Sequence, residues 1–249
     1  MPLNFGCRLA AVPVASLGAV FIGSQAAHAD LTDAPLLDIT ISGSSGWSYW
    51  LGNDDGWVQD TGEGIFEYGG EATWDECWFE WENEVEVDPG LGFGLTVTNT
   101  QTFTETFSIL LDVQVPGWSD GTLQGASIGG SVSDTNFDGS AELLAGSPSL
   151  MGAFLDGNRE IDLGAGLDVL VDQTGGTSIF GPFSEGLSGG SATIVGPQTT
   201  NGNLSIQIDF TLTAGDTASF SGGYLVEYVP SPAAILGLAG LGAFRRRRG

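Results

Sequence analysis

Apolar and polar residues alternate along three long stretches of the chain, and a period of two is typical of β-strands with one buried face. In residues 204–212 every even position is apolar and every odd position is polar. In residues 103–115 every odd position is apolar, with Glu105 as the one exception. Residues 218–228 show the alternation again. We therefore predict three strands here, with their apolar side chains facing a core.

Turn-forming residues separate the predicted strands. Asp88-Pro89-Gly90 and Pro116-Gly117 are two such groups, and the chain contains 40 glycines. No long apolar stripe at helical spacing lies outside the two termini. This pattern predicts an all-β fold, an antiparallel β-sandwich of the jelly-roll or immunoglobulin-like kind. We expect one domain over residues 30–228, with a weak internal boundary at the glycine-rich residues 186–196.

The N-terminus has the three parts of a signal peptide. Residues 1–8 carry one positive charge, and residues 9–23 form an apolar run. Ala27 and Ala29 then place small side chains at the two positions that a signal peptidase inspects. The apolar run is shorter than the roughly 20 residues that a helix needs to cross a bilayer. We expect signal peptidase to remove residues 1–29, so that the exported protein begins at Asp30.

The charge of residues 30–228 excludes several partners and reactions. This region holds all 31 acidic residues and one basic residue, Arg159, which gives a formal charge of −30. Such a surface repels nucleic acid and anionic lipid headgroups. The region has no His, the usual general base of a nucleophilic triad, and one Cys, Cys77. We predict that Cys77 is a small buried hydrophobe, the alternative being a bridge to another chain.

The C-terminus combines a short motif, an apolar segment and a basic end. The motif is Val229-Pro230-Ser231-Pro232, and residues 233–244 are mostly apolar. Twelve helical residues span about 18 Å, against roughly 30 Å of hydrocarbon, so this segment is a poor permanent anchor. We expect it to insert transiently in the inner membrane, because the positive-inside rule keeps the basic end in the cytoplasm. That end consists of Arg245, Arg246, Arg247 and Arg248.

This tail, residues 229–249, resembles the PEP-CTERM family of sorting signals. Ser231 stands where the family usually has Glu. The resemblance implies that an exosortase-like enzyme recognises the motif, removes the apolar tail, and releases or attaches the protein. It also implies a destination at the cell envelope, the cell surface or the extracellular matrix of a bacterium that makes exopolysaccharide. The resemblance concerns an address and implies no activity.

Six of the seven tryptophans lie between positions 47 and 81. Aromatic rings stack on the flat faces of sugars, so one hypothesis is a carbohydrate-binding platform. The alternative is that these rings form the core of the first sheet, because Trp buries a large area. The candidate glycan contacts are Trp47, Trp50, Trp57 and Trp74.

Residues 80–88 alternate acidic side chains with mostly apolar ones. This spacing places five carboxylates on one face of a strand. We interpret the face as a solvated edge that discourages aggregation, the alternative being a surface that collects cations. Paired carboxylates are also what a glycoside hydrolase needs, which makes a hydrolase the third functional hypothesis. The acidic residues are Glu80, Glu82, Glu84, Glu86 and Asp88.

Residues 134–139 match the opening half of a calcium loop. Asp134, Asn136 and Asp138 supply oxygens at positions one, three and five, and Gly139 permits the sharp turn. Position twelve is Ala145 in place of an acidic residue, so Glu142 at position nine is the fourth candidate ligand. The alternative is an Asx-rich turn between strands without a metal.

These patterns together predict an exported structural or adhesive protein of an exopolysaccharide-rich surface layer. The main alternative is a carbohydrate-binding module that uses the Trp-rich region. No cofactor other than calcium is expected, and no residue stands out as catalytic.

Overall fold

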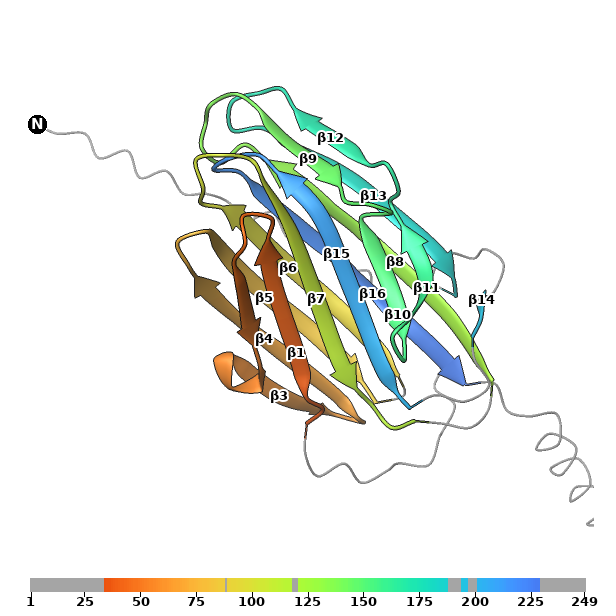
Figure 1. Ribbon diagram of the computed structural model, residues 1–249. Helices are drawn as coiled ribbons and strands as arrows, with labels where there is room; N and C mark the ends of the chain where they lie inside the picture. The colour runs from red at the N-terminus through yellow and green to blue at the C-terminus, as the bar shows by residue number, and fades with distance from the viewer. Residues whose placement is uncertain (1–33, 88, 118–120, 188–193, 197–200, 229–249) are drawn as a thin grey trace, which may run out of the picture.

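The computed structural model describes residues 34–87, 89–117, 121–187, 194–196 and 201–228. Two antiparallel sheets, named A and B, pack face to face, and the strands of sheet A cross in front of those of sheet B in Figure 1. The predicted all-β sandwich is confirmed. Within the described ranges, no helix is long and apolar enough to cross a membrane. The signal peptide, Asp30, Asp88 and the C-terminal tail lie outside the described residues.

Sheet A has eight strands, and six of them form a continuous path from one edge to the other. In order across the sheet these are β2 (Ser48–Leu51), β1 (Leu37–Gly43), β7 (Glu105–Gln114), β15 (Asn203–Leu212), β10 (Met151–Leu155) and β11 (Asn158–Leu163). The other two strands of sheet A are β9 (Ala141–Ala145), which pairs with β15, and β12 (Asp168–Val171), which pairs with β9.

Sheet B also has eight strands. In order they are β3 (Trp57–Gly62), β4 (Ile65–Thr73), β5 (Cys77–Glu86), β6 (Gly90–Asn99), β16 (Thr217–Tyr228), β8 (Thr122–Ser133) and β13 (Thr177–Gly186), while β14 (Ile194–Val195) pairs with β8. A short 3₁₀ helix, η1 (Asn53–Asp55), connects β2 with β3, so the chain passes there from the edge of sheet A to the edge of sheet B. β13 and β14, which lie on either side of residues 187–193 in the sequence, both pair with β8 in this sheet.

The predicted alternation decides which side chains form the core. On β15 the apolar positions from Leu204 to Leu212 are fully buried, and they face the inner side of sheet B. Phe210 packs against Phe107 of β7 at a ring separation of 5.3 Å and against Phe220 of β16 at 4.7 Å. These rings join the two sheets, because Phe220 belongs to sheet B and the other two to sheet A.

The prediction for residues 103–115 is wrong at Phe103 and Glu105. Phe103 precedes β7 and is 48% exposed, whereas Glu105, the expected exception, is fully buried. The reason is local hydrogen bonding, since Ser44 and Ser45 donate to the Glu105 carboxylate from the turn after β1. A buried charged group is tolerated when hydrogen bonds replace its hydration.

The expected edge position of residues 80–88 is also wrong. β5 pairs with β4 on one side and with β6 on the other, and the edge strand of this half of sheet B is β3. Glu80, Glu82 and Glu84 are exposed because they point away from the core on the outer face of sheet B. Local alternation therefore predicted their exposure, but it contains no information about which strands pair with β5.

Cys77 begins β5 and is fully buried, as predicted. Burial raises the pKa of its thiol to about 12, and the nearby carboxylate of Glu76 adds to this shift. A buried, protonated thiol is unreactive, because the thiolate is the form that exchanges with disulfides. The role of a small core residue is therefore favoured over a bridge to another chain.

Candidate functional site

Three of the clustered tryptophans contribute to packing. Trp81 is 5% exposed. Trp74 is half-buried and stacks on Tyr49 with ring centroids 4.3 Å apart and an interplanar angle of 4°. Trp47 is also half-buried and meets the ring of Phe107 edge-on at 5.8 Å. The core interpretation therefore holds for these rings, including two of the four candidate glycan contacts.

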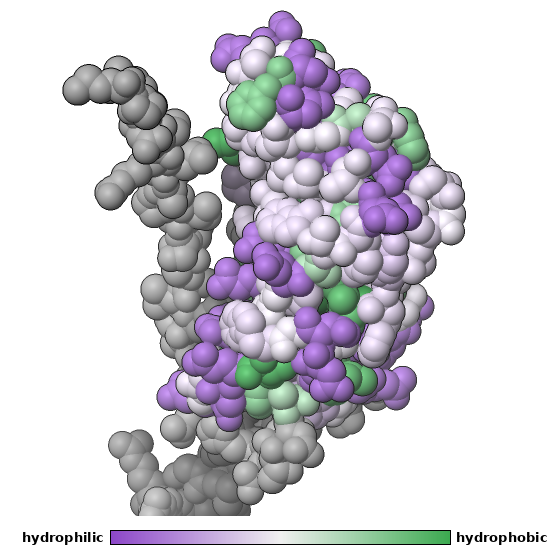
Figure 2. All heavy atoms as spheres, turned by 90° about the vertical axis from the view of Figure 1, so that its left-hand side faces the viewer, coloured by the Kyte–Doolittle hydropathy of each residue, from purple (hydrophilic) through white to green (hydrophobic). Residues whose placement is uncertain are grey.

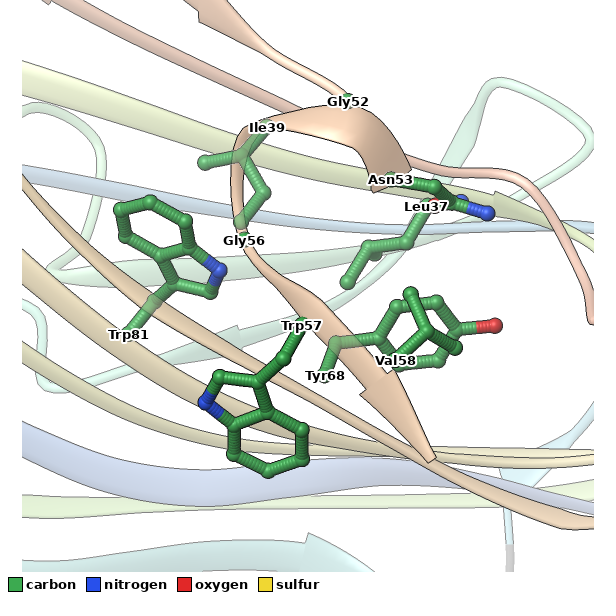
Figure 3. Close-up of a pocket in the computed structure, with 9 residues that line it drawn as sticks. All are labelled: Leu37, Ile39, Gly52, Asn53, Gly56, Trp57, Val58, Tyr68 and Trp81. Atoms are coloured by element: carbon green, nitrogen blue, oxygen red, sulfur yellow. The ribbon is translucent and has the colours of Figure 1, made fainter. Parts of the chain in front are cut away.

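The other two candidates, Trp50 and Trp57, are 61% and 47% exposed. The Trp50 ring lies over Gly52, where an added Cβ would come within 2.7 Å of the ring. The Trp57 ring lies over Gly69, where an added Cβ would come within 2.4 Å of the ring. In Figure 3 the Trp57 ring points away from Leu37. Since Trp50 projects from sheet A and Trp57 from sheet B, the four candidates do not form one platform.

A small cavity lies where η1 passes from sheet A to sheet B, with β1 on one side and β3, β4 and β5 on the other. Leu37, Ile39, Tyr68 and Trp81 line it together with residues of η1 and β3 (Figure 3), and its volume is about 10 Å³. A volume of this size holds at most one water molecule. It is therefore a packing defect at the edge of the sandwich and has no room for a ligand.

The outer face of sheet A carries a row of side chains that begins at Trp50. In the strand register, Trp50 of β2 is opposite Thr40 of β1, and Thr40 is opposite Leu110 of β7. Gln207 of β15 continues the row, and Gly152 of β10 follows it. Four strand spacings of about 4.8 Å give this row a length of about 19 Å.

The far end of the row is occupied by the guanidinium group of Arg159. A Cβ on Gly152 would come within 2.7 Å of this group, so the absence of a side chain at Gly152 leaves the space that Arg159 fills. Arg159 pairs with Asp162 at 2.5 Å and donates a hydrogen bond to Ser149 at 2.7 Å. The row therefore runs from an exposed indole at one edge of the sheet to a paired guanidinium near the other.

A groove of about 370 Å³ lies beside this row. The turn after β1 and the loop after β9 form its two sides, and strands β7 and β15 contribute to its floor. Its lining is rich in hydroxyl groups and includes one carboxylate: Ser42, Gly43, Ser44, Thr106, Phe107, Ser108, Gly146, Ser147 and Asp209. Hydroxyl and carboxylate oxygens on a flat sheet, next to an exposed indole, are suited to a polar ligand with flat faces.

Two more carboxylates lie on the same face. Asp38 of β1 and Asp112 of β7 are directly opposite in the register. Asp112 accepts hydrogen bonds from Ser205 and from Asn203 Nδ2, the latter at 3.0 Å. Oδ1 of Asp38 is shielded from solvent and accepts no hydrogen bond within the described part of the chain. This face therefore combines one exposed aromatic ring with an excess of negative charge.

The calcium candidates are held by their own hydrogen bonds in the turn after β8. Asp134 is 2% exposed, and its Oδ2 accepts hydrogen bonds from the backbone N–H groups of Gly139 and Gly175 at 3.0 and 2.9 Å. Burial alone would raise the pKa of Asp134, but backbone hydrogen bonds outweigh it and lower the pKa. Asp138 N–H donates to Asn136 Oδ1 at 2.8 Å, which is the geometry of an Asx turn.

Glu142, the fourth candidate ligand, belongs to β9, and its backbone N–H donates to Thr213 Oγ1 at 2.9 Å. Among the described residues, no three His, Cys, Asp or Glu side chains are placed to hold a metal ion. The geometry matches the alternative of an Asx-rich turn, and calcium binding stays a prediction.

A further carboxylate, Asp216, lies next to this turn and is fully buried. It accepts hydrogen bonds from Thr213 Oγ1 at 2.5 Å and from the backbone N–H of Thr135 at 3.3 Å. Burial raises its pKa, and the charges of Asp138 and Asp134 contribute to the rise. A buried acid of this kind is a structural element, since a substrate has no access to it.

The sequence patterns did not single out most residues of the outer face of sheet A. Thr40 and Gln207 are ordinary outward positions of amphipathic strands, and nothing in their local sequence distinguishes them, whereas Leu110 is an apolar residue between the outward-facing Ser108 and Asp112. The signal that could have led to them is the register of β1, β7 and β15, which places positions more than 160 residues apart in one row. Trp50 is the one member of this row among the predicted glycan contacts.

The chain was also compared with known proteins. No family model and no curated protein sequence matches it. Its candidate functions are therefore argued from its own residues, that is, from the outer face of sheet A and from the motifs at its two termini.

Proposed function

We propose that the chain is an exported structural or adhesive protein of the cell surface, and that it holds exopolysaccharide with the outer face of sheet A. The N-terminal and C-terminal motifs support the export and sorting of the protein. The observation that carries the adhesive part is the row from Trp50 to Arg159, with the adjacent groove. An exposed indole gives a sugar ring a surface to stack on, and the hydroxyl, amide and carboxylate groups beside it are hydrogen-bonding partners for sugar hydroxyls.

The surface chemistry agrees with a polar ligand. Figure 2 shows the left-hand side of Figure 1, at one edge of the sandwich, where hydrophilic and neutral residues predominate and hydrophobic residues form only small, separate patches. A protein that docks onto an apolar surface needs a contiguous apolar patch of several hundred Å². A hydrated polymer such as a polysaccharide is a better match for this surface than a lipid or an apolar protein face.

The two exposed tryptophans provide a matched test. The full chain, purified after export, is compared with the variants Trp50→Ala and Trp57→Ala in affinity electrophoresis against a panel of polysaccharides. Loss of a stacking ring costs about 1–3 kcal/mol by analogy with other flat ligands, which is about a fivefold or greater loss of affinity. We expect this loss for Trp50→Ala, while Trp57→Ala binds as the unchanged protein does, because Trp57 lies on the other sheet. If Trp50→Ala binds every polysaccharide as tightly as the unchanged protein, the adhesive role of this face is rejected.

A further inference from the structure

The charges on the outer face of sheet A restrict the class of glycan that it can hold. Asp38, Asp112 and Asp209 all project from this face, on neighbouring strands. Arg159 is the one basic residue of residues 30–228, and Asp162 already neutralises it at 2.5 Å. The face is therefore negatively charged in a domain that is itself strongly acidic, and a polysaccharide rich in carboxylate or sulfate groups is repelled from it.

The positions of the carboxylates relative to Trp50 suggest what the face attracts. Trp50 is directly opposite Thr40, and Asp38 is two residues from Thr40 on the same strand. Diagonal neighbours of this kind are about 7–8 Å apart. A sugar ring stacked on the indole can thus place a substituent next to Asp38, or next to Asp112, which is directly opposite Asp38.

One oxygen of the Asp38 carboxylate has no donor to offset its charge. This oxygen, Oδ1, is shielded from solvent and accepts no hydrogen bond from the described residues. Like charges directly opposite in a sheet are destabilising, and Asp38 and Asp112 are such a pair. An ammonium group between them would remove this repulsion and form charge-assisted hydrogen bonds.

We propose that the outer face of sheet A binds a polysaccharide with free amino groups, with a sugar ring on Trp50 and ammonium groups at Asp38, Asp112 and Asp209. This inference rests on the proposed function and adds the class of glycan. A neutral chain would use the indole and the hydroxyl groups only. An amino sugar polymer would use the carboxylates as well.

Three oligosaccharides of equal length and the same linkage test the proposal: a chitosan oligosaccharide with free amines, a chitin oligosaccharide with acetylated amines, and a cello-oligosaccharide with hydroxyl groups. Affinities are measured by calorimetry in a mildly acidic buffer, in which the amines are protonated. We expect the chitosan oligosaccharide to bind at least tenfold more tightly than the other two. We also expect its affinity to fall with added salt.

Two double variants with the same change in charge locate the binding. Asp112→Asn with Asp209→Asn removes two charges from sheet A, and Glu82→Gln with Glu84→Gln removes two from sheet B. The first pair should weaken chitosan binding about tenfold, which corresponds to about 1.4 kcal/mol, and the second pair less than about twofold. Melting curves show whether each variant folds. Asp38→Asn replaces the first pair if that pair does not fold, because an Asp38 oxygen accepts no hydrogen bond that would be lost.

The outcomes separate the two proposals. If chitin or cello-oligosaccharide binds as tightly as chitosan and Trp50→Ala weakens all three, the adhesive face stands and the preference for amines is overturned. If both double variants weaken chitosan binding equally, the polymer is attracted by the overall charge and the amine site is overturned. If no glycan in either experiment binds, the proposed function falls, and this inference with it.

Discussion

The indole Nε1 of Trp47 donates a hydrogen bond of 3.4 Å to the carboxylate of Glu105, which is fully buried at the start of β7. Ser44 and Ser45, in the turn after β1, donate to the same carboxylate, and so does the backbone N–H of Thr106. Glu105 therefore ties the β1–β2 turn to the neighbouring strand. This turn also forms one side of the groove on sheet A, so Glu105 sets the shape of the candidate site without contacting a ligand.

Replacing Glu105 by Ala should destabilise the protein, because several donors lose the same buried acceptor at once. We expect the free energy of unfolding to fall by about 1.5–3 kcal/mol, the range for hydrogen bonds to a charged group. Chemical denaturation of the variant measures this loss. Glu82→Ala is the control, since Glu82 is exposed on the outer face of sheet B and its loss should change stability by less than about 0.5 kcal/mol. Equal stability of the two variants would show that Glu105 is not held as described.

Protonation of Asp216 in acid should stabilise the folded protein, whereas protonation of Glu105 and Asp162 should destabilise it. Burial and the nearby charges of Asp138 and Asp134 raise the pKa of Asp216, so its contribution to stability is present at low pH and is lost as the pH rises through the raised pKa. The pKa values of Glu105 and Asp162 are lowered in spite of burial, because hydrogen bonds to both carboxylates outweigh it. Their contributions are present above the unfolded pKa and are lost as the pH falls through the lowered values.

The variant Asp216→Asn isolates this effect. Its melting temperature should exceed that of the unchanged protein at pH values above the raised pKa of Asp216, where the buried carboxylate is ionised. The difference should shrink as the pH approaches the unfolded pKa of Asp, about 3.9. Asp54→Asn, at an exposed position in η1, is the control and should leave the pH profile of the melting temperature unchanged. A difference that is independent of pH would contradict the raised pKa.

The turn after β8 allows a direct test of calcium binding. The double variant Asp134→Asn with Asp138→Asn should melt at a lower temperature even without metal, because Asp134 holds the amides of Gly139 and Gly175. We expect calcium to raise the melting temperature of the variant and the unchanged protein equally, as screening of the negative charge predicts, with sodium acting in the same way at matched ionic strength. A rise that saturates, prefers calcium over magnesium and disappears in the double variant would instead show a specific site.

Processing at both ends gives a prediction for the intact protein. The exported form should begin at Asp30 and end close to Pro232, because signal peptidase and an exosortase-like enzyme are expected to remove the flanking segments. Mass spectrometry of the protein from the cell surface and the medium measures both ends. Recovery of a mature species that still contains Arg245 to Arg248 would refute the sorting interpretation.

The period-two pattern of residues 204–212 was sufficient to predict both the strand and its buried face. Each apolar position on β15 is buried because a strand turns successive side chains to opposite sides, a property that depends on the backbone alone. The same reasoning failed at Phe103 and Glu105. There the burial of a charged group depends on donors from a turn some 60 residues away, which no local pattern contains.

The sequence by itself thus determined the fold class, the buried faces of the long strands, the exposure of the β5 carboxylates and the acidic charge of the domain. The tertiary structure alone decided which strands are edges, which tryptophans are exposed and which side chains meet on the outer face of sheet A. Trp50 and Gln207 lie in one row because β1 and β7 pair between them, and Trp50 and Trp57 are separated because η1 carries the chain to the other sheet. Alternation is a property of neighbouring residues, whereas strand order and register depend on how distant segments pack.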